Sequence, residues 1–357
     1  MQRHVALGEG EFAPGTVYLN SASSGLLPAR SAAAIRAALT ESASHGTMGR
    51  DYFGPAARAR AAFARLMGVP EERVALGSSV AVQSAFVAAS LPEGAEVLVA
   101  EGDFSSLVNP LAARSGCMVR RVPREALADA VRPGTALVAV SAVHALDGKL
   151  ADLAAVRQAA RAHGARTYLD ITQAAGWLPL PLADFDYVVC GAFKWLLCPR
   201  GTTFMVFGGE RGEIGGPGWP VPVHAGWAAG EDPGESNYGV VDRLAATARR
   251  YDEPHAHYSY VAAEHSLGLL AEIGVPTVHA HNLALAEQYR AGLRAAGYVP
   301  ESAPGSAIVS TPGLADAEPR LARAGVRVAV RGGLLRAAFH LYNSTDDVAR
   351  ALELLTE

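Results

Sequence analysis

The chain has 357 residues, of which 50% are hydrophobic and 18% charged, the balance of a folded globular protein of more than one subdomain. Its formal net charge of −4 argues against nucleic acid or an anionic membrane surface as a partner. No apolar run reaches the roughly 18 residues of a membrane helix, and the start of the chain lacks the apolar core of a signal peptide. The three cysteines, Cys117, Cys190 and Cys198, show neither metal-ligand spacing nor an even number for a disulfide framework. We therefore expect a cytoplasmic protein with reduced thiols and no metal site.

Helical and strand-like segments alternate from about residue 55. Residues 55–69 carry apolar side chains at three- and four-residue spacing, which predicts a helix, and residues 150–164 predict another. Short apolar runs of strand length lie among such helices: RVALGS, AEVLVAEG, TALVAVSAV, ARTYLDI, DYVVCGA and TTFMVF. Strands that are apolar on both faces and separated by helices predict an α/β fold, with a mostly parallel sheet covered on both sides.

The texture of the sequence changes twice after the last of these strands. Residues 209–239 are rich in Gly and Pro and too long for an ordinary connection, which favours a functional or interface loop. From about residue 258 a helical run leads to three more strand-like segments and a closing helix. We expect a large domain over residues 16–257 and a smaller α+β domain over residues 258–357. Residues 1–15 are expected to pack on the smaller domain.

One lysine stands out, because the sequence contains only two, Lys149 and Lys194, among 31 Lys and Arg residues. Lys194 follows the apolar run DYVVCGA and precedes Trp-Leu-Leu. A buried lysine is costly unless its pKa falls, and a lowered pKa makes the amine a nucleophile toward aldehydes, which arginine is not. The alternative, a surface lysine whose stem lies along apolar neighbours, fits this setting poorly.

Two further polar features follow strand-like runs. Asp170 closes the run ARTYLDI, where a carboxylate needs a cationic or N–H partner, and Gln173 comes three residues later. Ser78 and Ser79 follow RVALG and begin a helix, where backbone N–H groups and hydroxyls bind a phosphate. The simpler reading makes Asp170 and the serines helix caps. Because ligands of a parallel sheet bind at the carboxyl ends of its strands, we expect Lys194 and these features to meet there.

An aldehyde-capturing lysine, a carboxylate and a phosphate-binding turn together suit pyridoxal 5'-phosphate (PLP), which offers an aldehyde, a ring nitrogen and a phosphate. The chain resembles the class V aminotransferase family of fold-type I PLP-dependent enzymes, which includes cysteine desulfurases, kynureninases, C–S lyases and isopenicillin N epimerase-like proteins. The resemblance runs from YLNSASSGLLP near residue 18 to FHLYNSTDD near residue 347. Its most specific parts are LDITQAAG, GAFKWLLCPRGTTFM, VSAVHALDGKLADLAAV and LLRAAFHLYNS.

The resemblance implies a fold-type I PLP-dependent transferase fold and a homodimer with shared active sites. It implies that Lys194 is the catalytic residue, which bonds the cofactor aldehyde and later moves the substrate α-proton. The implied cofactor-binding residues are Ser78 and Ser79 for the phosphate, Phe104 (or its neighbour Ser105) for stacking on the ring, Asp170 for the ring nitrogen, Gln173 for the ring hydroxyl, and Lys194. The implied substrate-binding residues are Arg336 for the α-carboxylate, Asn20, and His144, for which a purely structural role is the alternative.

The chain departs from the family pattern at three places, and the third narrows the expected reaction. Phe193 stands where many relatives carry His or Tyr before the lysine, which removes a phosphate contact. Ala145 stands where desulfurases usually carry Asn. Residues 325–340, GVRVAVRGGLLRAAFH, lack the loop cysteine with which desulfurases attack the substrate sulfur. This argues against a persulfide-forming desulfurase.

We therefore expect a PLP-dependent enzyme acting on an α-amino acid, with β-elimination of the C–S lyase type as the first interpretation. Aminotransferase, amino-acid epimerase and decarboxylation-dependent deaminase activities are the alternatives, because no loop motif separates them. A non-catalytic PLP-binding protein is an alternative of another class, although a scaffold would need none of Lys194, Asp170 and Arg336. A nucleotide-binding Rossmann protein would need G-x-G-x-x-G after its first strand, which LGSSVAV does not provide.

Overall fold

The structure of the protein, a computed structural model, describes residues 4–46, 51–114, 116–208, 214–216, 218–301 and 304–356. Its strands are β1 (Val17–Tyr18), β2 (Val74–Gly77), β3 (Glu96–Ala100), β4 (Met118–Val122), β5 (Thr135–Ser141), β6 (Arg166–Asp170), β7 (Tyr187–Gly191), β8 (Thr203–Phe207), β9 (Ile308–Thr311), β10 (Val326–Arg327), β11 (Ala329–Arg331) and β12 (Leu334–Ala338). Its α-helices are α1 (Ala29–His45), α2 (Gly54–Met67), α3 (Val80–Ala89), α4 (Ser105–Ala113), α5 (Leu153–His163), α6 (His257–Ile273), α7 (Val275–Ala295), α8 (Glu318–Arg323) and α9 (Thr345–Thr356). Within this described part, no helix has the length and apolar character needed to cross a bilayer.

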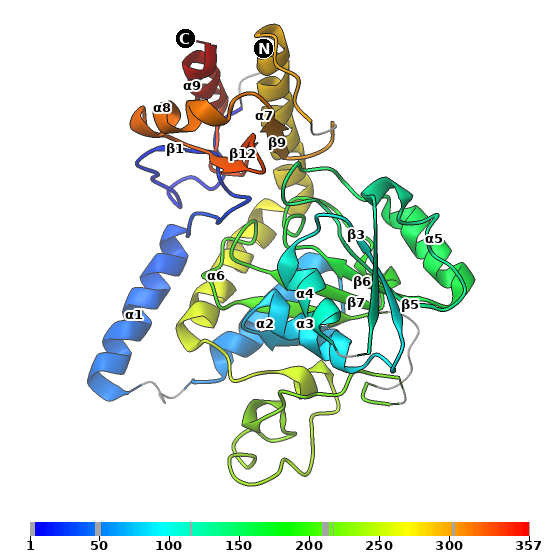
Figure 1. Ribbon diagram of the computed structural model, residues 1–357. Coiled ribbons are helices and arrows are strands. Elements are labelled where there is room, and N and C mark those ends of the chain that lie inside the picture. The colour runs from blue at the N-terminus through cyan, green and yellow to red at the C-terminus, as the bar shows by residue number, and fades with distance from the viewer. Residues whose placement is uncertain are drawn as a thin grey trace.

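A seven-stranded sheet forms the centre of the larger unit, with strand order β2-β8-β7-β6-β5-β3-β4 (Figure 1). The strands from β4 to β7 are parallel, whereas β8 runs antiparallel to both β7 and β2. The predicted α/β fold with a mostly parallel sheet is confirmed. Since β5, β6 and β7 all end at one edge, the residues that follow them meet there.

Successive residues of the central strands are buried on opposite faces of this sheet. On β6, Leu169 packs in the core that also contains residues of α2, α5 and α6, whereas Tyr168 packs in the core formed with α3 and α4. Both side chains have no exposed surface. This double burial explains why the sequence of these strands reads as continuous apolar runs.

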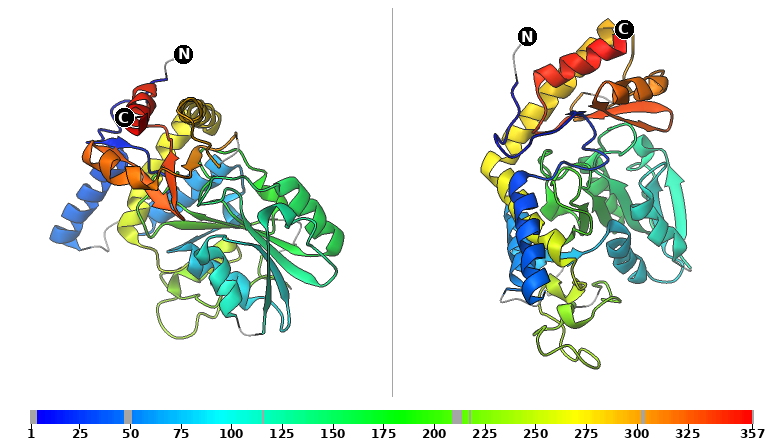
Figure 2. Two further views of the ribbon diagram at one scale, coloured as in Figure 1. Left: turned by 45° about the horizontal axis from the view of Figure 1, so that its top comes forward. Right: turned by 90° about the vertical axis from the view of Figure 1, so that its left-hand side faces the viewer.

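The smaller unit is built on a three-stranded antiparallel sheet with strand order β11-β12-β9. Its core joins residues of α7, α8 and α9 to this sheet. Near the start of the described chain, the His4 backbone N–H donates to Thr345 Oγ1 at 2.8 Å, and that of Leu7 donates to the Leu341 carbonyl at 2.6 Å. The segment that contains His4 and Leu7 therefore lies beside the start of α9 and the residues just before it (Figures 1 and 2).

The two domain boundaries predicted from the sequence, 15/16 and 257/258, stay predictions, and the packing of the segments around them is as follows. Strand β1 pairs with β10, and Leu19 is part of the smaller core, so the chain still lies with the smaller unit after residue 16. Helix α6 packs on α1 and α2, and its Leu267 and Leu270 lie in the larger core. Along the chain, α7 is the first helix that contributes residues to the core of the smaller unit. Local apolar spacing predicts a helix but not the core against which it packs.

Candidate active site

The turn after β7 carries Lys194 into the protein, where only 5% of the residue is exposed. The N-terminal segment holds this turn, because the Gly25 backbone N–H donates to the Phe193 carbonyl at 2.9 Å. A side chain at position 25 would clash with the Lys194 carbonyl oxygen, so the close approach requires glycine. Leu197 has a left-handed backbone with φ of 59°, a conformation that costs free energy in a residue other than glycine. The lysine therefore sits in a strained turn that a distant segment fixes in place.

Burial lowers the pKa of Lys194 to about 8. The carboxylate of Asp170 opposes this shift, while the positive charges of Arg336 and Arg200 add to it. A lysine whose pKa lies near 8 has a substantial neutral fraction at mildly alkaline pH, and the neutral amine is the form that attacks an aldehyde.

This lowered pKa predicts how fast the cofactor-free protein captures an aldehyde at different pH values. The rate of PLP uptake should rise with pH and reach half of its plateau near pH 8, because the amine loses its proton there and not near its ordinary value of 10.5. Most of the rise should fall within about one pH unit on either side of that value. Stopped-flow absorbance of the bound cofactor measures the rate. A midpoint near pH 10 would contradict a desolvated amine.

Asp170 ends β6, next to β7 in the sheet, and is 3% exposed. Its Oδ1 accepts a hydrogen bond from the Thr172 backbone N–H at 2.7 Å. Burial raises the pKa of Asp170 to about 6, against the lowering effect of Thr172 and of Lys194. A buried carboxylate that is ionised at neutral pH gains stability from a cationic partner, and the protonated ring nitrogen of PLP is such a partner.

The amide of Gln173 is held at both ends. Its Nε2 donates to the Ala22 carbonyl at 3.0 Å, and its Oε1 accepts from Trp195 Nε1 at 2.8 Å. These contacts fix the orientation of the amide and leave it one N–H. Since Gln173 lines the same cavity as Lys194, the predicted hydrogen bond to the ring hydroxyl is sterically open to it.

A cavity of about 430 Å³ opens onto the lysine. It is lined by Ala22, Ser23, Gly102, Asp103, Phe104, Ser105, Ala145, Leu146, Gln173, Phe193, Lys194, Arg200, Arg331 and Arg336. The Nζ atom of Lys194 lies 5.1 Å from the centroid of the Phe104 ring, and Phe104 is 43% exposed. An accessible aromatic face beside the amine suits the predicted stacking of Phe104 on a planar ring.

Arg336 lies on β12 and enters this cavity from the smaller unit. Its Nη2 donates to Ser23 Oγ at 2.8 Å and its Nη1 to the Ala145 carbonyl, whereas its buried Nε has no hydrogen-bond partner among the described residues. Burial lowers the pKa of Arg336 to about 10, so the guanidinium stays charged at neutral pH. A buried guanidinium without a carboxylate partner in the described chain favours an anionic ligand.

Ser23 reaches this cavity from the N-terminal segment, and the substrate-binding role of Asn20 stays a prediction. The Asn20 carbonyl accepts the Ser23 backbone N–H at 2.9 Å, so Asn20 shapes the turn that carries Ser23. Asn20 itself is not among the residues that line the cavity. The sequence signal was available, since SASSG offers three hydroxyls next to Asn20, but nothing in it says which one points inward.

The role of His144 as a donor to the substrate stays a prediction, as does the structural role that is its alternative. Its Nδ1 lies 2.8 Å from Asp147 Oδ1 and its Nε2 lies 3.0 Å from the Gly102 carbonyl, so both ring nitrogens already have partners. Burial alone would lower the pKa of His144, but Asp147 and the Gly102 carbonyl outweigh burial and raise it. The imidazole therefore braces the loop that leads to Phe104.

The two serines predicted to bind phosphate have partners of their own. Ser79 caps α3, with its Oγ accepting the Val82 backbone N–H at 3.3 Å. Ser78 Oγ donates to Glu253 Oε2 at 2.9 Å, and its backbone N–H faces the other oxygen of that carboxylate at 3.4 Å. The phosphate role of Ser78 and Ser79 stays a prediction, and neither residue lines the cavity.

No cysteine lines the cavity. Cys190 and Cys198 are buried, and burial raises the pKa of both thiols, which makes them poor nucleophiles. Cys117 follows α4 and is half-buried. Among the residues that the structure describes, no cluster of His, Cys, Asp and Glu is suited to a metal ion.

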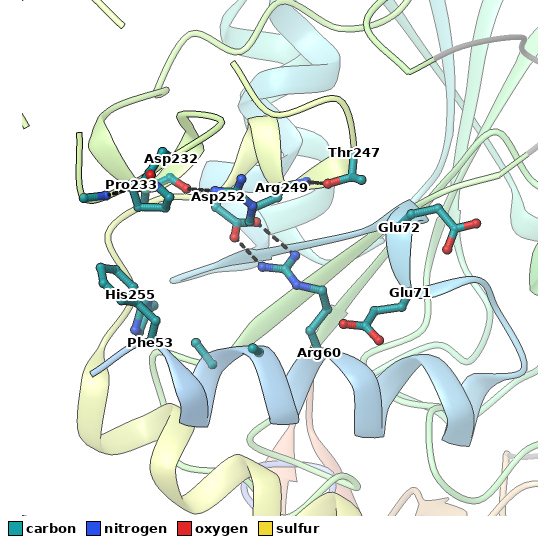
Figure 3. Close-up of a pocket in the computed structure, with 14 residues that line it drawn as sticks. Phe53, Arg60, Glu71, Glu72, Asp232, Pro233, Thr247, Arg249, Asp252 and His255 are labelled. Atoms are coloured by element: carbon teal, nitrogen blue, oxygen red, sulfur yellow. Dashed lines mark hydrogen bonds and ion pairs between the residues drawn. The ribbon is translucent and has the colours of Figure 1, made fainter. Parts of the chain in front are cut away.

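A roomier cavity of about 700 Å³ lies elsewhere, between the start of α2 and the segment 228–255 (Figure 3). Arg60 and Asp252 face each other inside it and form a buried ion pair. Neither lysine of the chain is among its lining residues. The 700 Å³ cavity thus has no lysine amine that could react with an aldehyde, whereas the 430 Å³ cavity contains Lys194 and is the candidate active site.

The comparisons with known proteins give the family of the chain. Residues 17–302 match the family model described as aminotransferase class-V. An uncharacterized aminotransferase, YcbU of Bacillus subtilis (strain 168), is 26% identical over 311 residues, covering 83% of this chain and 81% of its own. Isopenicillin N epimerase of Amycolatopsis lactamdurans is 29% identical over 212 residues, or 52% of each chain.

Solved structures share the fold at lower identity. The complex of the cystine C–S lyase C-DES with cysteine persulfide superposes with a TM-score of 0.84, at 21% identity, over 96% of this chain and 98% of its own. Cysteine desulfurase from Thermococcus onnurineus NA1 gives a TM-score of 0.82 at 18% identity, over 96% of this chain and 94% of its own. This chain belongs to the class V aminotransferase family, and it is a PLP-dependent enzyme of fold-type I.

Proposed function

We propose that this enzyme catalyses β-elimination from an α-amino acid that carries a sulfur leaving group on its β-carbon. One observation carries the proposal. The same cavity is lined by Lys194, whose pKa is lowered, and by Arg336, which is suited to bind a carboxylate, and no cysteine is among its lining residues. A desulfurase needs a thiol there to accept the substrate sulfur, whereas elimination needs only proton transfer and departure of the leaving group.

In this proposal each polar group of the cavity has a separate task. When bound, PLP supplies an electron sink that stabilises negative charge at the substrate α-carbon. Arg336 binds the α-carboxylate, and Lys194, whose pKa is near 8, takes the α-proton. Asp170 keeps a proton at the ring nitrogen, and Phe104 covers the ring. The net reaction converts the amino acid and one water into pyruvate, ammonia and a thiol.

The reaction type is tested by products in the absence of any 2-oxo acid acceptor. Cysteine S-conjugates and ordinary amino acids are incubated with the enzyme, and pyruvate, ammonia, thiol and the chirality of the remaining substrate are measured separately. We expect pyruvate, ammonia and thiol in equal amounts from the S-conjugates, because elimination releases all three together. Turnover that depends strictly on an added acceptor would contradict the proposal.

Transamination and epimerisation are the second candidates, favoured by the names of the sequence relatives. They start from the same Lys194 and Arg336, and the same incubation separates them. An acceptor-dependent keto acid identifies transamination, and inversion at the α-carbon without pyruvate identifies epimerisation. The homodimer predicted from the sequence stays a prediction; the strongly exposed Tyr238 and Val240 are the kind of side chains that a second copy would cover.

A further inference from the structure

The residue next to the catalytic lysine offers the cofactor no hydrogen bond. Phe193 lines the cavity, and the centroid of its ring lies 5.7 Å from Lys194 Nζ. In PLP the aldehyde and the phosphate-bearing methylene occupy neighbouring ring carbons, so the phosphate must come to rest close to the lysine amine. A phosphate dianion beside an apolar ring needs its counter-charge from elsewhere.

The start of α3 already faces a negative charge of the protein itself. The Glu253 carboxylate contacts the backbone N–H and the hydroxyl of Ser78. The preceding residue anchors it, because Asp252 pairs with Arg60 and accepts the Leu76 backbone N–H at 2.8 Å (Figure 3). A second anion at this helix start would meet the repulsion of Glu253, which weakens the favourable contribution of the helix dipole.

One cation stands at the required place without a carboxylate partner among the described residues. The guanidinium carbon of Arg200 lies 4.2 Å from the centroid of the Phe193 ring, a cation–π contact that orients the side chain. Arg200 also lines the cavity that contains Lys194. The ring of Phe193 thus has Arg200 on its face and the lysine amine close by.

The strand register puts Arg200 at the same edge as the lysine and the start of α3. Thr203, at the beginning of β8, pairs with Gly77 at the end of β2 and with Gly191 at the end of β7. Arg200 precedes Thr203 by three residues. At this edge the buried hydroxyl of Thr202 and the buried amide of Gln83 have no hydrogen-bond partner in the described chain. These groups suit an acceptor-rich ligand that binds there.

We propose that Arg200, held on the face of Phe193, binds the phosphate of the cofactor and replaces the hydrogen bond that Phe193 cannot donate. A guanidinium donates two parallel N–H bonds to a phosphate, and the aromatic platform limits the rotamers that it loses on binding. The proposal concerns cofactor binding alone and holds whichever reaction the enzyme catalyses.

The test compares PLP with pyridoxal, which has the same aldehyde and lacks the phosphate. The holoenzyme is stripped of cofactor with hydroxylamine, and both compounds are titrated back while tryptophan fluorescence and cofactor absorbance are followed. In Arg200→Gln we expect the dissociation constant of PLP to rise about 10- to 100-fold and that of pyridoxal to change less than about twofold. Arg331→Gln, which removes another arginine of the same cavity, is the matched control and should leave both constants within about twofold.

Two results would overturn the proposal. Equal weakening of PLP and pyridoxal in Arg200→Gln would mean that the arginine only supports the turn around Lys194. If Arg331→Gln weakens the binding of PLP as much as Arg200→Gln does, the cavity binds the phosphate through its overall charge. If Arg200→Gln does not fold, Arg200→Lys keeps the charge and loses the paired donors, and it should weaken PLP but not pyridoxal. Thermal unfolding of each cofactor-free variant checks the fold.

Discussion

Replacing Lys194 with alanine is expected to lower turnover by about 10³-fold or more, because the variant loses both the amine that bonds the cofactor and the base for the α-proton. The second lysine of the chain cannot take over. Lys149 lies beside Asp147, with 3.8 Å between Nζ and Oδ2, and is absent from the residues that line the cavity. The rate is measured with the substrate that the product screen identifies.

The chain offers a matched control, because Lys149 is its only other lysine. Lys149→Ala should keep turnover within about twofold of the unmodified enzyme, as expected for a half-exposed surface ion pair. Borohydride reduction of the holoenzyme followed by peptide mapping adds a readout independent of activity. We expect the cofactor on the peptide that contains Lys194; a label on the Lys149 peptide would refute the assignment.

Replacing Arg336 with glutamine is expected to raise the KM of an amino-acid substrate about 100-fold, which corresponds to about 2.7 kcal/mol. The guanidinium is 4% exposed and is positioned by Ser23 and the Ala145 carbonyl, so a bound carboxylate meets a preorganised and desolvated donor. The change in KM should exceed the change in kcat, since the carboxylate is bound in both the ground state and the transition state.

Arg336→Lys separates charge from geometry at the same position. A lysine keeps one positive charge but lacks the paired donors, so its KM should fall between those of the wild type and of Arg336→Gln. Amines of the same side chain that lack the carboxylate provide the second comparison. Their binding should be equally weak in all three proteins; a loss of their binding in Arg336→Gln alone would mean that the substitution distorts the cavity.

The residues that could be predicted from the sequence are those that follow a strand. Asp170 and Lys194 come directly after apolar runs, and parallel strands bring such positions to one edge of the sheet, so their meeting followed from local pattern alone. Contacts between segments that lie far apart in the sequence carry no such signal. The spacing of residues in the sequence does not show that Ser23 lines the cavity, nor that the carboxylate of Glu253 contacts Ser78. Each of these contacts depends on how distant segments pack.

The same limit applies to the domain boundaries and to the role of His144, which stay predictions. Whether β1 joins the larger or the smaller unit depends on its pairing with β10, which lies far along the chain. His144 became a candidate donor because it sits in a family motif, but Asp147 and the Gly102 carbonyl take up its nitrogens. A titratable residue in a motif shows its chemistry only when its hydrogen-bond partners are known.

The pairing of β1 with β10 also orders the events of biosynthesis. The segment that follows β1 supplies Ser23 to Arg336 and Gly25 to the turn of Lys194, yet β10, the partner strand of β1, leaves the ribosome long after this segment. The large sheet, complete at β8, is free to fold first, as N-terminal units do during synthesis. The segment that contains β1 must wait beside it until residue 326 arrives. A truncated product therefore keeps its lysine and cannot finish the pocket around it.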